Sequence, residues 1–271
     1  MANVALITGA SRGIGAAIAQ RFAAGGFAVG ITARTQHEGD HRLEGSLDNT
    51  ASRIRAAGGS VLPITADLAR QADRARIVET VERELGPIDV LVNNAAVTYF
   101  EPVRDFPERH YQVMFDVQVR ATFELAQRVL PGMRERHRGW ILNISSRAAV
   151  HPAGPPYTGR GGSTVYGMCK AAIERFSSGL ASEVYADGIA VNALSPSGLV
   201  PTPGVVFHHL TDGVSEDRLE APEVMAEAAY ALCTGDPARV TGKVTYAKPI
   251  LEELGVPVPK MPPSPPALSQ R

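Results

Sequence analysis

The sequence is poor in cysteine, with only Cys169 and Cys233 among 271 residues. A chain of this length can bury a core that needs no disulfide, so we expect a reducing compartment and a cytoplasmic protein. No apolar run approaches the roughly 18 residues that a membrane span requires. The first apolar stretch has no basic residue before it and ends at Gly9, so we expect a strand there rather than a signal peptide.

Neither sign of charge is in excess, because 27 basic residues stand against 28 acidic ones and give a net charge of -1. This balance supplies no positive field for a phosphate backbone or an anionic membrane, so we expect neither as a partner. What the sequence does have is apolar content, with 44% hydrophobic and 20% charged residues. These values are typical of a folded chain with a substantial core, and they exclude the disordered and fibrous classes.

Apolar strands alternate with helical patterns along most of the chain. The first unit is a strand over 4–7, a turn at Thr8-Gly9 and a helix that ends at Gly25-Gly26. The other expected strands span 27–32, 61–65, 88–92, 140–144 and 189–194. Helical patterns follow near 50–57, 72–85, 107–130, 165–186 and 222–233. The alternation predicts a single doubly wound α/β domain with a parallel sheet of about seven strands, covered on both faces.

Four segments depart from this alternation. Residues 36–49 form a polar insertion after the second strand, 147–164 are rich in glycine and proline, and 196–221 have no regular period. Loops at the carboxyl ends of parallel strands bind ligands, so we expect the last two segments to lie over a substrate. Six prolines among the 16 residues 256–271 predict a mobile tail, which leaves 1–255 as the catalytic domain.

The turn after the first strand is rich in glycine and reads Thr8-Gly-Ala-Ser-Arg-Gly-Ile-Gly15. Glycines between a strand and a helix let backbone amides approach a pyrophosphate, and the helix amino terminus offers unpaired N–H groups to the anion. A glycine-rich turn without a ligand is the alternative, which we disfavour because a strand and a helix flank the motif. The turn therefore predicts dinucleotide binding.

Further motifs follow this TGxxxGxG turn in a fixed order. They are Asp67, Asn93-Asn-Ala-Ala96, Ser145-Ser146, Tyr166-Gly-Met-Cys-Lys170, and Pro196 with Thr202. In this order the sequence resembles the classical short-chain dehydrogenase/reductase family over residues 3 to about 247. The resemblance implies a Rossmann-type fold and an oxidoreductase that moves hydride between a nicotinamide cofactor and a carbonyl or secondary alcohol. The carboxyl region and the insertion after Arg34 resemble the hydroxysteroid-dehydrogenase-like protein 2 branch.

Tyr166 and Lys170 are the expected centre of the chemistry. Residues four apart share a helix face, so the Lys170 ammonium can favour the ionised phenol and lower a pKa of about 10. By resemblance, Tyr166 is the acid or base, Ser146 polarises the carbonyl oxygen, and Lys170 holds the nicotinamide ribose. Ser145 is the alternative serine. The resemblance also places Gln118 where the family usually has a proton-relaying asparagine.

The end of the second strand favours NADP(H) over NAD(H). An NAD enzyme normally has an acidic residue there for the ribose 2′-OH, whereas this sequence has Ala33 followed by Arg34, with Arg12 in the glycine turn. Two guanidinium groups suit a 2′-phosphate, although Arg34 pointing to solvent is the alternative. The resemblance adds the other expected cofactor-binding residues: Gly9, Ser11, Gly13, Ile14, Gly15, Asp67, Leu68, Asn93, Ala95, Tyr166, Lys170, Pro196 and Thr202.

The loops over the site predict a bulky, largely apolar ketone or alcohol as substrate, because 147–164 and 196–221 contain many Val, Pro, Leu, Phe and Tyr residues. A β-ketoacyl-thioester reductase is the alternative enzyme. A second alternative is a nucleotide-binding scaffold that has lost turnover, motivated by Gln118, Ala96 and Ser197 at positions where the family usually differs.

No metal site is expected, because the acidic and histidine residues between His37 and His41 read as a solvated polar loop. The resemblance also implies a homotetramer or homodimer that pairs through the helices near 107–130 and 165–186.

Overall fold

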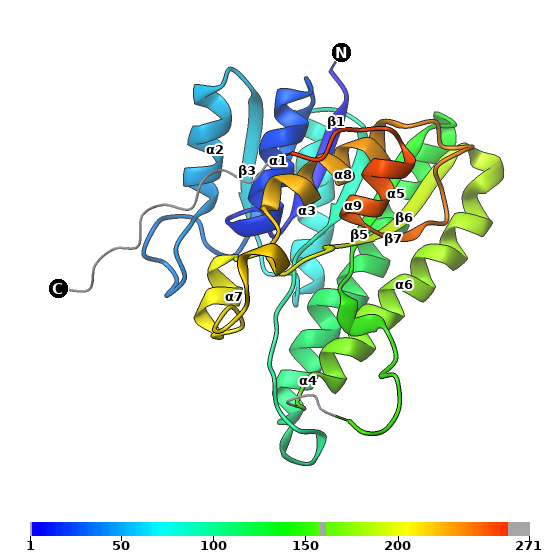
Figure 1. Ribbon diagram of the computed structural model, residues 1–271. Coiled ribbons are helices and arrows are strands. Elements are labelled where there is room, and N and C mark those ends of the chain that lie inside the picture. The colour runs from blue at the N-terminus through cyan, green and yellow to red at the C-terminus, as the bar shows by residue number, and fades with distance from the viewer. Residues whose placement is uncertain (1, 158–160, 260–271) are drawn as a thin grey trace.

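The computed structural model describes residues 2–157 and 161–259 of the protein. Within these residues seven strands form one sheet in the order β3-β2-β1-β4-β5-β6-β7, and each neighbouring pair is parallel (Figure 1). The strands are β1 (Val4–Thr8), β2 (Ala28–Ala33), β3 (Ser60–Thr65), β4 (Ile88–Asn93), β5 (Gly139–Ile144), β6 (Ile189–Ser195) and β7 (Val244–Tyr246). The predicted doubly wound α/β domain is confirmed.

Helices cover both faces of this sheet. They are α1 (Gly13–Ala24), α2 (Leu47–Ala56), α3 (Gln71–Glu84), α4 (Glu108–Phe115), α5 (Ala121–Glu135), α6 (Thr164–Val184), α7 (Pro203–Phe207), α8 (Pro222–Thr234) and α9 (Ala247–Glu253). On one face α1 contacts α2 and α8, and on the other α3 contacts α5 while α6 packs against β6. None of the helices in the described ranges is long and apolar enough to cross a bilayer.

The strands contribute side chains to two hydrophobic cores, one on each face of the sheet, because successive side chains point to opposite faces. Ile7 of β1 packs in one core with Phe22 of α1, while its neighbour Leu6 packs in the other with Leu125 of α5. All four side chains are fully buried. Burial of both faces explains why the strands read as nearly continuous apolar runs in the sequence.

The structure corrects the expected elements in the second half of the chain. The single helix expected near 107–130 is interrupted by a π-helical turn at Asp116–Arg120, which separates α4 from α5. The stretch 196–221 is not wholly irregular, because it contains the short helix α7. Strand β7 and helix α9 lie beyond the last predicted helix. The predicted proline-rich tail lies outside the described residues from Lys260 onward.

Candidate active site

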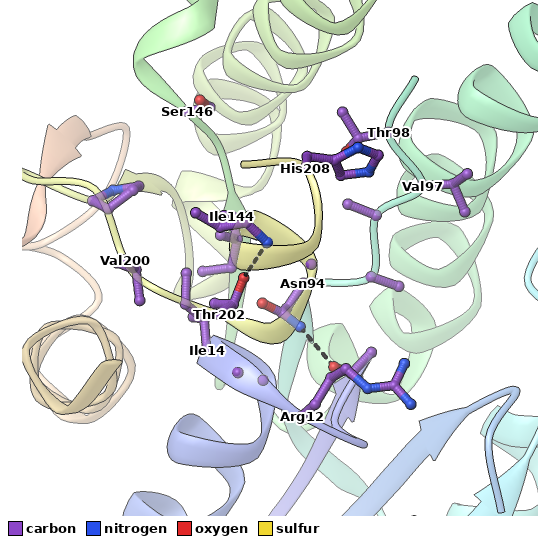
Figure 2. A pocket seen from close by; sticks show the side chains of 18 of the residues that line it. Arg12, Ile14, Asn94, Val97, Thr98, Ile144, Ser146, Val200, Thr202 and His208 are labelled. Atoms are coloured by element: carbon purple, nitrogen blue, oxygen red, sulfur yellow. Dashed lines mark hydrogen bonds between the residues drawn. The ribbon is translucent and has the colours of Figure 1, made fainter. Parts of the chain in front are cut away.

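A cavity of about 1090 Å³ opens over the carboxyl ends of the strands. It lies where the strand order reverses, with β2 on one side of β1 and β4 on the other. The turn after β1, the ends of β4 and β5, the start of α6 and the loop after β6 supply its walls. In Figure 2, Arg12 and Ser146 stand toward opposite ends of the view, with Asn94 and Thr202 between them.

The glycine turn can exist only without side chains at three positions. Gly9 and Gly13 have φ of 68° and 56°, which side chains disfavour, and a Cβ on Gly15 would collide with the Gly9 carbonyl and the Asn94 amide. The Asn94 side chain fixes the turn by donating to the carbonyls of Thr8 (2.9 Å) and Gly9 (3.1 Å). Helix α1 begins at Gly13, and its first three residues line the cavity. This cradle fits the phosphates of a dinucleotide.

Three arginines and a histidine line the end of the cavity beside β2: Arg12, Arg34, Arg42 and His41. The Arg12 guanidinium donates at 2.6 to 3.1 Å to three backbone carbonyls of the insertion, those of Leu43, Glu44 and Gly45. Burial lowers the pKa of Arg12, and Glu38 opposes that shift. Burial also lowers the pKa of His41, and the charges of the three arginines lower it further. Such a cluster fits an anion more than a ribose hydroxyl.

The opposite end of the cavity brings Ser146, Tyr166 and Lys170 together. Ser146 lies close enough to the Tyr166 hydroxyl to lower its pKa, and the Ser146 hydroxyl accepts a hydrogen bond from the Ala148 amide at 3.2 Å. The Lys170 ammonium lies 5.6 Å from the centre of the Tyr166 ring and donates to the Ile144 carbonyl at 2.8 Å. These contacts hold a hydroxyl pair and one buried cation at a single point of the cavity.

Ser145, the alternative serine, is engaged elsewhere. Its hydroxyl donates to a carboxylate oxygen of Glu174 at 2.7 Å, and the residue is 4% exposed. Ser146, by contrast, lies close enough to the Tyr166 hydroxyl to lower its pKa. The geometry therefore favours Ser146 as the group that can reach a carbonyl oxygen.

Burial has a larger effect on these groups than the sequence suggested. It raises the pKa of Tyr166, against the lowering effect of Ser146, and it lowers the pKa of Lys170 to about 8. This net direction is opposite to the lowering that the spacing of Tyr166 and Lys170 predicts. A low-dielectric surrounding disfavours the charged form of either group, and spacing along a helix does not reveal that surrounding.

Nearly all predicted site residues line this one cavity. They are Gly9, Ser11, Arg12, Gly13, Ile14, Gly15, Arg34, Asp67, Leu68, Ala95, Ser146, Tyr166, Lys170, Pro196 and Thr202. Asn93 and Gln118 are not among the lining residues. The Asn93 side chain donates instead to Asn143 at 2.9 Å inside the protein, and that of Gln118 donates to the Val97 carbonyl at 2.9 Å. The side-chain oxygen of Gln118 is buried and has no hydrogen-bond partner among the described residues.

The structure adds lining residues that sequence reasoning missed. The Phe100 ring lies 6.0 Å from the Tyr166 ring and 5.6 Å from the His208 ring, so an aromatic wall adjoins the Ser146–Tyr166 pair (Figure 2 shows Ser146 and His208). Three cations from separate segments also line the cavity: Arg147, Arg218 and Lys248. Phe100 and His208 lie in loops without a period, so only their aromatic character could have drawn attention to them.

The short chain dehydrogenase family model matches residues 3–207, which is most of the chain. The chain belongs to this family. It is therefore an oxidoreductase that acts on CH–OH and C=O groups, as the resemblance predicted. The scaffold alternative, which rested on three departures from the usual motifs, has no support from this match.

Individual relatives agree with this assignment. The chain is 32% identical over 243 residues to an acetoacetyl-CoA reductase of Allochromatium vinosum, covering 87% of this chain and 92% of that protein. It is 32% identical over 253 residues to hydroxysteroid dehydrogenase-like protein 2 of Xenopus tropicalis, covering 92% of this chain. A crystal structure of a metagenomic short-chain oxidoreductase in complex with NADP matches 90% of this chain and 96% of its own, with 27% identity and a TM-score of 0.73.

The chain is shorter than some of these relatives. It spans 58% of the Xenopus protein and 60% of a short chain dehydrogenase of Pseudocercospora fijiensis. The relatives named hydroxysteroid dehydrogenase-like protein 2 match 92% of this chain at 30–32% identity.

Proposed function

We propose that the protein is an NADP(H)-dependent oxidoreductase that acts on a bulky, largely apolar ketone or the corresponding secondary alcohol. The observation that carries the proposal is that one cavity has guanidinium groups at one end and the Ser146–Tyr166–Lys170 cluster at the other. The phosphate cradle of the glycine turn lies along the same cavity. A dinucleotide bound along it would therefore have its adenosine near Arg34 and its nicotinamide near Tyr166.

The cofactor, when bound, supplies or accepts the hydride. Arg12 and Arg34 would hold its 2′-phosphate, the amides of the glycine turn its pyrophosphate, and Lys170 its nicotinamide ribose. The NADP bound to the metagenomic neighbour supports this cofactor class. NAD(H) is the alternative.

The chain's own residues supply the proton and orient the carbonyl. The Ser146 hydroxyl donates a hydrogen bond to the carbonyl oxygen and polarises it, and the Tyr166 hydroxyl gives its proton to the same oxygen as the alcohol forms. Because burial raises its pKa, Tyr166 stays protonated at neutral pH, which is the form that reduction requires. Lys170, tied to the Ile144 carbonyl, keeps a donor beside the phenol.

Apolar and aromatic side chains form part of the cavity wall, and they favour an apolar substrate. These side chains include Tyr99, Phe100, Leu199, Leu210 and Val214. We expect kcat/KM for bulky cyclic or long-chain ketones to exceed that for small charged keto acids by about ten- to a hundredfold, because one buried aromatic or aliphatic group contributes about 1.5–3 kcal/mol. NADPH oxidation measured at matched ketone concentrations tests this, and higher kcat/KM on the charged acids would contradict the proposal.

A second candidate is reduction of a β-ketoacyl thioester. Arg147, Arg218 and Lys248 line the substrate end of the cavity and could accept an anionic carrier, and the relative from Allochromatium is named as an acetoacetyl-CoA reductase. Adding acetoacetyl-CoA to the same panel separates the two candidates. A kcat/KM above that of every free ketone would favour the thioester.

We expect a homo-oligomer, with a homotetramer or homodimer as the form. On α5 the Phe123 side chain is 50% exposed, and its ring lies 6.0 Å from that of Phe176 on α6, so the two helices share an apolar surface. Packing of this surface against a second copy would steady the helix that carries Tyr166 and Lys170. Light scattering at micromolar concentration should give at least twice the monomer mass of 28.8 kDa, and a monomer would contradict the expectation.

The state of the two cysteines supports a cytoplasmic location. Cys169 and Cys233 are both free and buried. Free thiols persist in a reducing compartment such as the cytoplasm.

A further inference from the structure

The polar insertion between β2 and α2, here called the insertion loop (residues 36–46), is an ordered part of the site. The Glu38 carboxylate accepts from the Gly45 amide at 3.0 Å and from the Asn49 side chain at 2.6 Å. The Arg12 guanidinium donates to three carbonyls at the other end of the loop. The predicted solvated loop is therefore fixed by its own hydrogen bonds and by a residue of the glycine turn.

From this position the loop reaches across to α7. The guanidinium carbon of Arg42 lies 4.2 Å from the centre of the Phe207 ring, which is the last residue of α7. Leu43 of the loop approaches Gly204 within the same helix. Figure 1 shows α7, in yellow, next to the blue segment that precedes α2. A cation above an aromatic face is attractive, by about 0.5–2 kcal/mol.

Helix α7 in turn adjoins the reacting end of the cavity. His208, directly after Phe207, places its ring 5.6 Å from that of Phe100, which lies 6.0 Å from that of Tyr166. Burial lowers the pKa of His208 and the charge of Arg42 lowers it further, so Arg42 acts electrostatically on this histidine. A series of neighbouring side chains thus runs from Arg42 of the insertion loop through Phe207, His208 and Phe100 to Tyr166.

The insertion loop also meets the positive cluster expected to hold the 2′-phosphate. Arg12 and Arg34 line the cavity beside His41 and Arg42, and like charges at close range repel. An anion bound among them would remove that repulsion and favour the arrangement in which Arg42 covers Phe207. The same anion would therefore stabilise α7 over the site.

We infer that Arg42 is a positioning residue that couples a phosphate on the adenosine ribose to the placement of α7 over the substrate end of the cavity. The inference rests on the proposed NADP(H) preference. Since coupling free energies are reciprocal, an ordered α7 would also increase the affinity for the phosphate.

The test uses two cofactor fragments that lack the nicotinamide, adenosine 2′,5′-bisphosphate and adenosine 5′-monophosphate. Calorimetry measures their affinities. Amide hydrogen exchange follows Val206, His208, His209 and Leu210, whose amides donate to backbone carbonyls within and beside α7. In the wild type, the bisphosphate should slow this exchange about three- to tenfold more than the monophosphate does, as a cation–π contact of this strength permits. In Arg42→Ala, the two fragments should slow this exchange equally. The variant should still bind the bisphosphate more tightly than the monophosphate.

Two further variants control this experiment. Arg42 is exposed, so its truncation leaves the core intact, and Arg42→Lys, which keeps a cation for Phe207, should retain part of the difference. Arg83→Ala, on α3 and 65% exposed, should behave as the wild type. The inference would be overturned if the bisphosphate bound more tightly than the monophosphate but did not slow amide exchange in α7 further. It would also be overturned if the bisphosphate slowed this exchange equally in Arg42→Ala. Either result would leave the proposed cofactor preference standing. Equal affinities for the two fragments would overturn the proposed cofactor preference and the inference with it.

Discussion

Replacing Tyr166 by phenylalanine should lower kcat by about 10²- to 10⁴-fold, the usual contribution of a positioned general acid. The variant loses the hydroxyl that donates the proton, but it keeps the ring beside Phe100. Cofactor affinity should stay near the wild-type value, because Lys170 retains its bond to the Ile144 carbonyl. Single-turnover NADPH oxidation and nicotinamide fluorescence measure the two quantities separately.

Tyr157→Phe is the matched control for this variant. Tyr157 is 73% exposed and does not line the cavity, and the sequence has no lysine four residues after it. Its loss should leave kcat unchanged. If Tyr157→Phe were inactive while Tyr166→Phe kept more than a few per cent of the activity, the assignment of the proton donor would be wrong.

Arg34→Ala should weaken NADPH binding by about ten- to a hundredfold, because a hydrogen bond to a charged group contributes about 1.5–3 kcal/mol. NADH carries no 2′-phosphate, so its affinity should change little. Arg34 is a cleaner probe than Arg12, whose guanidinium also holds the insertion loop through three carbonyls. Fluorescence titration with both cofactors gives the ratio of dissociation constants.

The comparison of the two cofactors supplies its own control. An equal loss of affinity for NADPH and NADH would mean that Arg34 supports the shape of the site rather than a phosphate. Equal wild-type affinities would contradict the preference itself.

Elements with a strong period were predictable from the sequence, and short elements were not. Strand β1 and helix α1 follow from an apolar run, a glycine turn and residues at helical spacing that end at Gly25-Gly26. Strand β7 has three residues and α7 has five, so neither spans enough positions to show a period. The π-helical turn at Asp116–Arg120 was invisible because the residues on both sides of it continue a helical pattern.

Site residues were predictable where they belong to a motif of nearby residues in the sequence. Gly9, Gly13, Tyr166 and Lys170 belong to such motifs, and all four line the cavity. Arg42 reaches the site only because the insertion loop folds back against α7, a contact between distant residues that no local pattern encodes. The direction of the Tyr166 pKa shift depends on burial, which is likewise a property of the folded chain.

The π-helical turn has a consequence for how this chain tolerates changes of length. A π turn holds one residue more than an α turn, and each residue rotates a helix by about 100°. Deleting one residue from Asp116–Arg120 would restore a regular helix but rotate α4 relative to α5, and the fully buried Met114 would leave its place beside Val165 and Cys169. Point substitutions in this segment keep the rotation of α4 relative to α5, whereas a single-residue deletion changes it. Sequence alignments across this helix should therefore place a one-residue gap here when a relative lacks the turn.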